Sequence, residues 1–178
     1  LCYIMKNLIN TVINRQKAFF KTRNTFDISK RKHFLKKLRD EIRLNEKEIE
    51  TALFNDLRKS EGESYLTEIH FVYSELKIAI NNIDKWTKRK SIRSSLLNFP
   101  SSDYIIAQPY GVTLHISPWN YPFQLSIAPL VGAIAAGNTV VLKPSEYSKN
   151  TSLILEKIIN TVFDEDLVKV VKGGPEVA

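Results

Sequence analysis

Two short turns in the second half of the sequence carry the residues best suited to chemistry. In the first, residues 117–122, Asn120 stands between two prolines with an aromatic side chain on either side, Trp119 and Tyr121. A rigidly held carboxamide can donate a hydrogen bond to an oxygen that gains negative charge, and removing one such donor lowers a rate by about 10²–10³. The same spacing is also typical of an ordinary turn, because asparagine bonds readily to its own backbone.

The second turn, residues 143–146, pairs a cation with a carboxylate. Lys143 ends a run of β-branched and apolar residues, and Glu146 follows three positions later. Together they could bind both hydroxyls of a ribose, and a carboxylate near the 2′-hydroxyl would favour NAD over NADP. The alternative is structural: Lys143 is a solvated strand end, Ser145 caps a helix, and Glu146 interacts with the positive end of that helix.

Alternating strands and helices are predicted around these turns. The predicted strands are 111–116, 139–142 and 167–171, and the predicted helices are 122–136 and 148–162. Pro129 removes a hydrogen bond from the first helix, so we expect a kink or break near Leu125. Ser148 or Thr151 should cap the second helix. Because crossovers between parallel strands are right-handed, the pattern predicts a doubly wound parallel sheet with ligands at the carboxyl ends of its strands.

The first half of the sequence is predicted to be helical, which divides the chain into a helical region, residues 1–100, and an α/β region, residues 101–178. Helix starts are indicated at Asp27 or Ser29, at Asn45 with Glu48, and at Ser60 with Glu63. An apolar stripe then predicts one long half-buried helix: Tyr65, Ile69, Val72, Leu76, Ile80, Ile83 and Trp86. We expect residues 88–102 to form an exposed connection and residues 104–107 a short strand.

Composition limits the class of protein. Apolar residues make up 43% of the 178 positions and charged residues 25%, which is typical of a globular protein. The single cysteine, Cys2, cannot form an internal disulfide, so we expect a reducing, cytoplasmic location. The longest nearly apolar run, residues 127–142, is too short to span a bilayer, so we predict no membrane segment. His33, His70 and His115 lack the spacing of a metal site, and we predict no metal.

The net charge of +7 is concentrated at the start of the chain, because residues 1–45 hold 12 Lys and Arg and 3 Asp and Glu. Such a segment could bind nucleic acid or an anionic membrane surface. Its basic residues alternate with a periodic apolar set, however, and no nucleic-acid-binding motif accompanies them. We therefore expect no nucleic-acid partner, and the basic helical binder remains an alternative function.

The stretch from Gly111 to Glu146 resembles the aldehyde dehydrogenase superfamily. Three segments carry the resemblance in order: ISPWNYPF (116–123), PLVGAIAAGN (129–138) and TVVLKPSE (139–146). The short helical region with its Tyr65-bearing helix is similar to the class that oxidises medium-chain, fatty and aromatic aldehydes, often as homodimers. The resemblance implies a helical segment followed by the first βαβαβ part of a Rossmann-like doubly wound parallel sheet, an incomplete NAD(P)-binding domain.

The resemblance also implies roles for individual residues. Asn120, with a backbone N–H, would hold the aldehyde oxygen as it becomes an oxyanion, in the crevice where the strands end and beside the nicotinamide ring. The implied cofactor residues are Ile116, Ser117, Pro118 and Trp119 on the nicotinamide-ribose side and Lys143, Pro144, Ser145 and Glu146 at the adenosine ribose. Tyr65 would face the substrate tunnel, or else pack within its apolar stripe. The cofactor would be NAD, with NADP as the alternative.

One departure from the family pattern bears on activity. The family's mechanism needs a cysteine that attacks the aldehyde to form a thiohemiacetal, and a glutamate that activates the water which releases the acid. These residues are expected beyond Ala178, and Cys2 matches no motif that could replace the nucleophile. We therefore expect the N-terminal part of an aldehyde dehydrogenase, inactive alone. A truncated, non-catalytic nucleotide-binding or dimerisation module is the other alternative.

Overall fold

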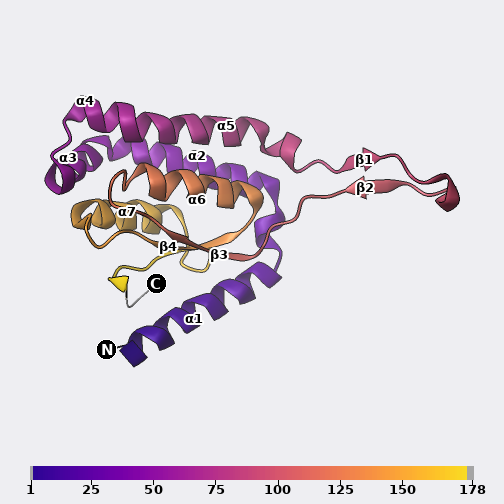
Figure 1. The fold of residues 1–178 in the computed structure, drawn as a ribbon, viewed down its shortest axis with the longest axis horizontal. Coiled ribbons are helices and arrows are strands. Elements are labelled where there is room, and N and C mark those ends of the chain that lie inside the picture. The colour runs from indigo at the N-terminus through magenta and orange to yellow at the C-terminus, as the bar shows by residue number, and fades with distance from the viewer. Residues whose placement is uncertain (1, 176–178) are drawn as a thin grey trace.

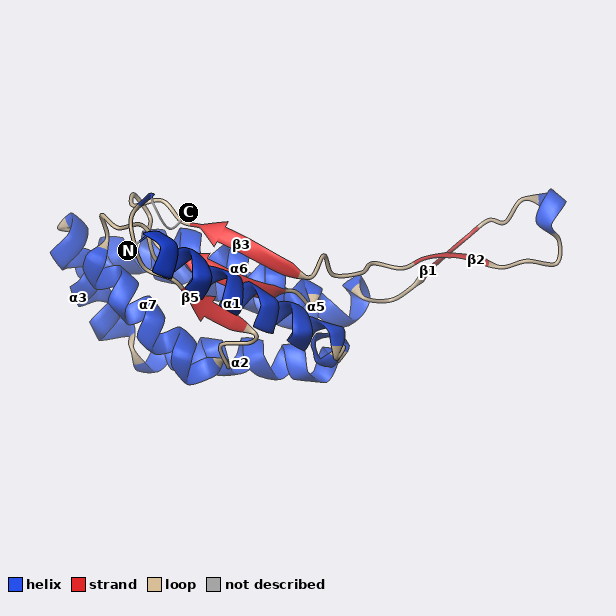
Figure 2. Ribbon diagram, turned by 90° about the horizontal axis from the view of Figure 1, so that it is seen from below, coloured by secondary structure: helices blue, strands red, loops and turns tan. Residues whose placement is uncertain are grey.

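The computed structural model describes residues 2–175 and is layered (Figures 1 and 2). A parallel sheet is covered on one face by α1 (Cys2–Lys21) and on the other by α6 (Gln124–Ala136) and α7 (Lys149–Val162). Three further helices pack outside α6 and α7: α2 (Ile28–Leu44), α3 (Glu46–Leu57) and α5 (His70–Trp86). A short 3-10 helix, η1 (Asn24–Phe26), links α1 to α2. One apolar core joins the helical region to the sheet, and the division at residue 100 stays a prediction.

The sheet consists of β3 (Val112–Ile116), β4 (Thr139–Lys143) and β5 (Val168–Val170), in that order and all parallel. Every residue of the central strand β4 is buried, which explains its unbroken β-branched and apolar run. The predicted order of strand, helix, strand, helix and strand is confirmed. The chain therefore contains the first βαβαβ part of a doubly wound sheet.

Helix α6 continues through Pro129 to Ala136, so the break expected near Leu125 is absent. The carbonyl of Leu125, which Pro129 cannot bond, accepts a hydrogen bond of 3.4 Å from the Ser117 hydroxyl. This contact offsets part of the bond lost to proline. The helix ends at Gly137, as expected, where a φ of 90° gives the left-handed conformation that glycine adopts readily.

The predicted helix starts in the first half differ in their outcome. Asp27 caps α2 with its side chain, and Ser60 caps α4 (Glu61–Ser64), as predicted. Asn45 precedes α3 but does not cap it, because its Nδ2 donates to the carbonyl oxygen of Glu41 at 2.8 Å. The connection between α2 and α3 is so short that the Asn45 side chain bonds backwards, and the predicted capping box is wrong there.

The long predicted helix is present as three consecutive segments: α4, a π-helical turn (Tyr65–Ile69, labelled η2) and α5. Most of the apolar stripe is buried, whereas its two ends, Tyr65 and Trp86, are exposed. Glu68 lies within this π turn and is buried. Such turns are frequent at functional sites, which directs attention to what Glu68 contacts.

A two-stranded arm projects from the body between α5 and β3 (Figure 1). Its strands, β1 (Lys90–Ile92) and β2 (Asp103–Ile105), pair antiparallel, and a 3-10 helix, η3 (Leu96–Asn98), lies at the tip. The expected connection 88–102 therefore contains a strand. The predicted strand 104–107 is present but starts one residue earlier and is shorter.

Candidate active site

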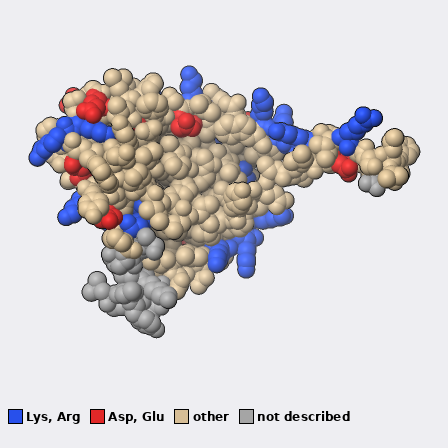
Figure 3. Space-filling view, viewed as in Figure 1, with Lys and Arg blue, Asp and Glu red and all other residues tan. Residues whose placement is uncertain are grey.

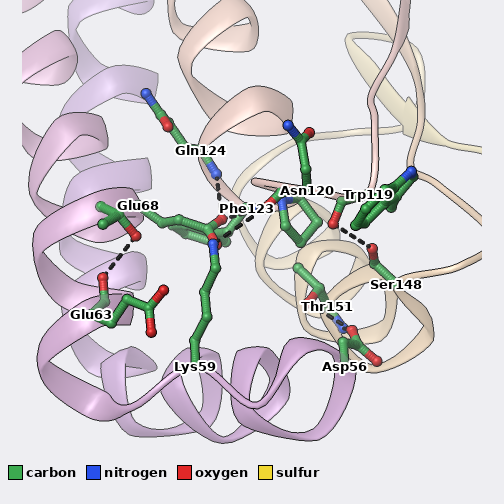
Figure 4. A network of polar contacts seen from close by, with 12 residues as sticks. Asp56, Lys59, Glu63, Glu68, Trp119, Asn120, Phe123, Gln124, Ser148 and Thr151 are labelled. Atoms are coloured by element: carbon green, nitrogen blue, oxygen red, sulfur yellow. Dashed lines mark hydrogen bonds and ion pairs between the residues drawn. The ribbon is translucent and has the colours of Figure 1, made fainter.

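The two turns predicted to carry the chemistry lie side by side at the carboxyl ends of β3 and β4. The backbone N–H of Ser117 donates to the carbonyl oxygen of Lys143 at 3.0 Å. The Ser148 hydroxyl donates to the carbonyl oxygen of Trp119 at 3.4 Å (Figure 4). Parallel strands end at the same edge of a sheet, so the fold itself brings the two turns together.

The side chain of Asn120 is exposed and points away from Lys59 (Figure 4). Its carboxamide makes no hydrogen bond with the residues that the structure describes, whereas its backbone carbonyl accepts one of 3.2 Å from Lys59 Nζ. Within residues 2–175 β3 is an edge strand and residues 118–121 are exposed, so the crevice expected around the carboxamide stays a prediction. The sequence predicted the turn and its position at the strand end, but not the exposure.

Sequence reasoning missed a buried ion pair beneath this turn. Lys59 Nζ lies 2.6 Å from Glu68 Oε1, and both side chains are buried. The Lys59 ammonium also lies 4.1 Å from the ring centre of Tyr121. Glu68 Oε2 accepts hydrogen bonds from the backbone N–H groups of Phe123 at 2.8 Å and Gln124 at 3.2 Å. A carboxylate from the helical region thus satisfies the start of α6, which has no side-chain cap of its own.

Helix α7 is likewise capped from another helix. Asp56 of α3 accepts hydrogen bonds from the backbone and side chain of both Asn150 and Thr151, at 2.7–3.1 Å. Ser148 precedes α7 but makes no capping bond, and Thr151 donates to Asp56, so the predicted local caps are wrong. Both helices that follow the two turns are therefore anchored by carboxylates from the helical region.

Lys143 and Glu146 form an ion pair in the second turn. Lys143 is 4% exposed, and its Nζ lies 3.1 Å from Glu146 Oε2, which belongs to a partly exposed carboxylate. The pKa of Glu146 is lowered, first by a hydrogen bond from its own backbone N–H and then by the Lys143 ammonium. The turn therefore presents an ionised carboxylate at neutral pH.

A pocket of about 280 Å³ opens beside this turn. It is lined by residues that follow β4 and residues that follow β5: Pro144, Ser145, Glu146, Lys149, Ser152, Leu153, Lys172 and Gly173. Lys172 and Gly173 were not predicted site residues, although the glycines that end the third strand were a signal for them. A carboxylate with two lysines suits a ligand that carries both sugar hydroxyls and phosphate groups.

The other predicted site residues are divided between two places. Ser117, the first residue of that turn, is buried, while Ile116, Pro118 and Trp119 are exposed at the same sheet edge. Tyr65 is 38% exposed and lines a separate pocket of about 620 Å³ with residues of α2, α3 and α5. None of residues 117–122 lines this pocket. Core packing, the alternative for Tyr65, is not found.

Several polar groups elsewhere add no catalytic cluster. Burial lowers the pKa of His115 on β3, and its Nδ1 is buried without a partner among the described residues. Within residues 2–175 no three His, Cys, Asp or Glu side chains lie together as metal ligands. Cys2 begins α1, and its side chain lies outside the described part.

The basic residues of the first 45 positions are spread over the fold. Arg15 pairs with Asp166 and Lys32 with Asp84, and Arg31 is buried. Figure 3 shows Lys and Arg in several separate groups on the visible face, not in one patch. This distribution does not favour the basic helical binder. No helix in the described part is long and apolar enough to cross a membrane.

A family model described as the aldehyde dehydrogenase family matches residues 4–178 of this chain. The chain belongs to the aldehyde dehydrogenase family. The 4,4′-diaponeurosporen-aldehyde dehydrogenase of Staphylococcus aureus is 45% identical to it over 170 residues, which cover 96% of this chain and 37% of that enzyme. The aldehyde dehydrogenase family 3 member F1 of Arabidopsis thaliana is 39% identical over 174 residues, covering 98% and 36%. The chain thus spans just over a third of the length of these relatives.

Solved structures agree with this family assignment. A substrate-bound aldehyde dehydrogenase of Staphylococcus aureus superposes with a TM-score of 0.93 at 45% identity, covering 95% of this chain and 37% of that one. The NADP complex of a glyceraldehyde-3-phosphate dehydrogenase from Methanocaldococcus jannaschii superposes with a TM-score of 0.82 at 22% identity, covering 94% and 37%. The first match supports the family, and the second supports the fold alone. The expected fold, the N-terminal part of the aldehyde dehydrogenase fold, is confirmed.

Proposed function

We propose that this chain contributes the oxyanion donor and the first part of the cofactor site to an NAD(P)-dependent aldehyde dehydrogenase, which oxidises an aldehyde to a carboxylic acid. One observation carries the proposal. The Asn120 turn is held through its backbone at Ser117, Trp119 and Asn120, while the exposed Asn120 carboxamide makes no hydrogen bond among the described residues. Its N–H groups are therefore free to bind a developing oxyanion from a backbone that is already held in place.

The cofactor proposal rests on the second turn and its pocket. Lys143 and Glu146 would hold the adenosine ribose, with Pro144 and Ser145 alongside, and Lys149 provides positive charge for phosphate groups. Lys172 lines the same pocket and is paired with Glu156 at 2.5 Å. When bound, the cofactor accepts the hydride that leaves the aldehyde carbon. The Glu146 carboxylate favours NAD over NADP. The two lysines of the same pocket leave NADP as the alternative.

The first turn would bind the other half of the cofactor. Ile116, Pro118 and Trp119 are exposed at the carboxyl edge of the sheet, next to the second turn. We assign these residues and Ser117 to the nicotinamide-ribose side. They would act mostly through the backbone, and they would place the nicotinamide near Asn120.

The substrate and the oligomeric state complete the proposal. We propose that the substrate is a medium-chain, fatty or aromatic aldehyde. We also propose Tyr65 as a substrate contact, because its side chain is exposed. We also propose a homodimer. The arm formed by β1 and β2 supports it, because exposed apolar side chains gather there: Ile92, Leu96, Leu97, Phe99, Tyr104 and Ile105. Such a patch marks a protein interface.

Replacement of Asn120 tests the proposal in the protein expressed from its complete reading frame. Asn120→Asp keeps the side-chain shape but removes the N–H donor. We expect kcat to fall by about 10²–10³, with the Kd of the cofactor nearly unchanged. Asn160→Ala, an exposed asparagine on α7, is the control and should retain activity. Full turnover by Asn120→Asp would remove Asn120 from the oxyanion role.

A further inference from the structure

The buried ion pair under the first turn contacts that turn at both of its ends. Glu68 is 0% exposed and Lys59 is 8% exposed. The Lys59 ammonium has three neighbours. Glu68 Oε1 lies at 2.6 Å, the carbonyl oxygen of Asn120 at 3.2 Å and the ring centre of Tyr121 at 4.1 Å. The ammonium is thus committed entirely to its carboxylate partner and to two consecutive residues of the turn.

Glu68 holds the other end of the same turn. Its second oxygen accepts the backbone N–H groups of Phe123 and Gln124, the first two free donors after Pro122, which has none. One carboxylate therefore fixes the start of α6 and, through Lys59, the backbone of Asn120. Figure 4 shows Lys59 and Glu68 approaching the turn from the helical region, on the side opposite the Asn120 carboxamide.

Stability alone is a poor reason for such a pair. Removing two charges from water costs about as much as their attraction returns, so buried pairs are often no more stable than apolar replacements. Geometry is a better reason. The Asn120 side chain has no hydrogen bond of its own among the described residues, so its position follows from its backbone, and Lys59 is the side chain that bonds to that backbone.

We infer that Lys59 and Glu68 are positioning residues for Asn120, which hold its backbone so that the carboxamide meets the oxygen of the reacting aldehyde. The inference rests on the oxyanion role proposed above for Asn120. The new element is that the chemical step depends on two buried side chains. Lys59 lies 61 residues before Asn120, and Glu68 lies 55 residues before Phe123.

The test uses Lys59→Met and the double variant Lys59→Met/Glu68→Gln in the protein expressed from its complete reading frame. A misplacement of about 1 Å can cost about 10²-fold in rate, so we expect Lys59→Met to lower kcat by about 10–100-fold while the KM for the cofactor stays within about threefold. The double variant removes both charges, so it should regain thermal stability, yet its kcat should stay low. The control is Ile42→Ala, which destabilises the core from α2 without touching the turn.

A mutant cycle separates positioning from a merely structural role. If Lys59 acts through Asn120, the loss caused by Lys59→Met should shrink to less than about threefold in an Asn120→Ala background. An equal loss in both backgrounds, a wild-type kcat in the double variant, or a loss no larger than that of Ile42→Ala would each overturn the inference.

Hydrogen exchange distinguishes this inference from the proposed function. Amides of residues 117–125 should exchange faster in the double variant than in the wild type, whether or not the protein oxidises aldehydes. An inactive wild-type protein would refute the proposed function, and with it the catalytic consequence of the pair. Unchanged exchange of residues 117–125 would refute the tether itself.

Discussion

Asp56 offers the sharpest test of how the helical region supports the sheet. Its carboxylate accepts four hydrogen bonds at the start of α7, two from Asn150 and two from Thr151. The two bonds from Asn150 are exposed, so water replaces them readily. The two from Thr151 are partly buried, and each contributes about 1 kcal/mol net. Asp56→Ala should therefore lower the free energy of unfolding by about 2 kcal/mol, the upper end for loss of a helix cap.

Thermal unfolding followed by circular dichroism measures this loss. For a chain of this size about 2 kcal/mol corresponds to a fall in Tm of about 4–8 °C. Thr151→Val, which removes one partly buried bond, should cost about half as much. Ser148→Ala is the comparison variant, because Ser148 occupies the capping position but makes no capping bond, so it should lose only the 3.4 Å bond to the Trp119 carbonyl.

Comparing the loss of stability in Asp56→Ala with that in Ser148→Ala shows which residue caps α7. If the helix were capped locally, as the sequence alone predicts, Ser148→Ala would destabilise the protein more than Asp56→Ala. That result would refute the assignment of Asp56 as the cap of α7.

Three further substitutions test the fold. Gly137→Ala should destabilise by about 2 kcal/mol, because its φ is 90° and a Cβ would lie 2.7 Å from the Arg31 guanidinium, whereas Gly132→Ala in open space should not; chemical denaturation compares them. His115→Gln should flatten the stability profile as the pH falls through about 6.5. Burial lowers the pKa of His115, so below about 6.5 the unfolded chain binds a proton that the folded chain does not, and stability decreases as the pH decreases. Hydrogen bonds from Ser29 and Lys30 lower the pKa of Asp27, so the Tm penalty of Asp27→Ala should be full at pH 7 and fade as the pH falls below about 4. An unchanged pH slope in His115→Gln, or a constant penalty in Asp27→Ala, would contradict these assignments.

The sequence alone determined the parallel order of strands, the position of both turns and the family. Each of these depends on local information. A β-branched and apolar run such as β4 must be buried on both faces, and parallel strands separated by helices allow one handedness of crossover. The positions of the turns could be predicted because proline and glycine end the strands and helices next to them.

Only the tertiary structure decided which groups hold those turns. Glu68 and Asp56 cap α6 and α7 across up to 56 and 95 residues, and Lys59 reaches Asn120 across 61. Nothing in a linear pattern shows which backbone groups these three charged residues bind, and Glu68 is buried within a π turn that the sequence did not predict. A backbone N–H donates to any acceptor, and a backbone carbonyl accepts from any donor, that packing brings near it. Helix packing, not sequence spacing, therefore selected the carboxylates and the lysine that hold the candidate site.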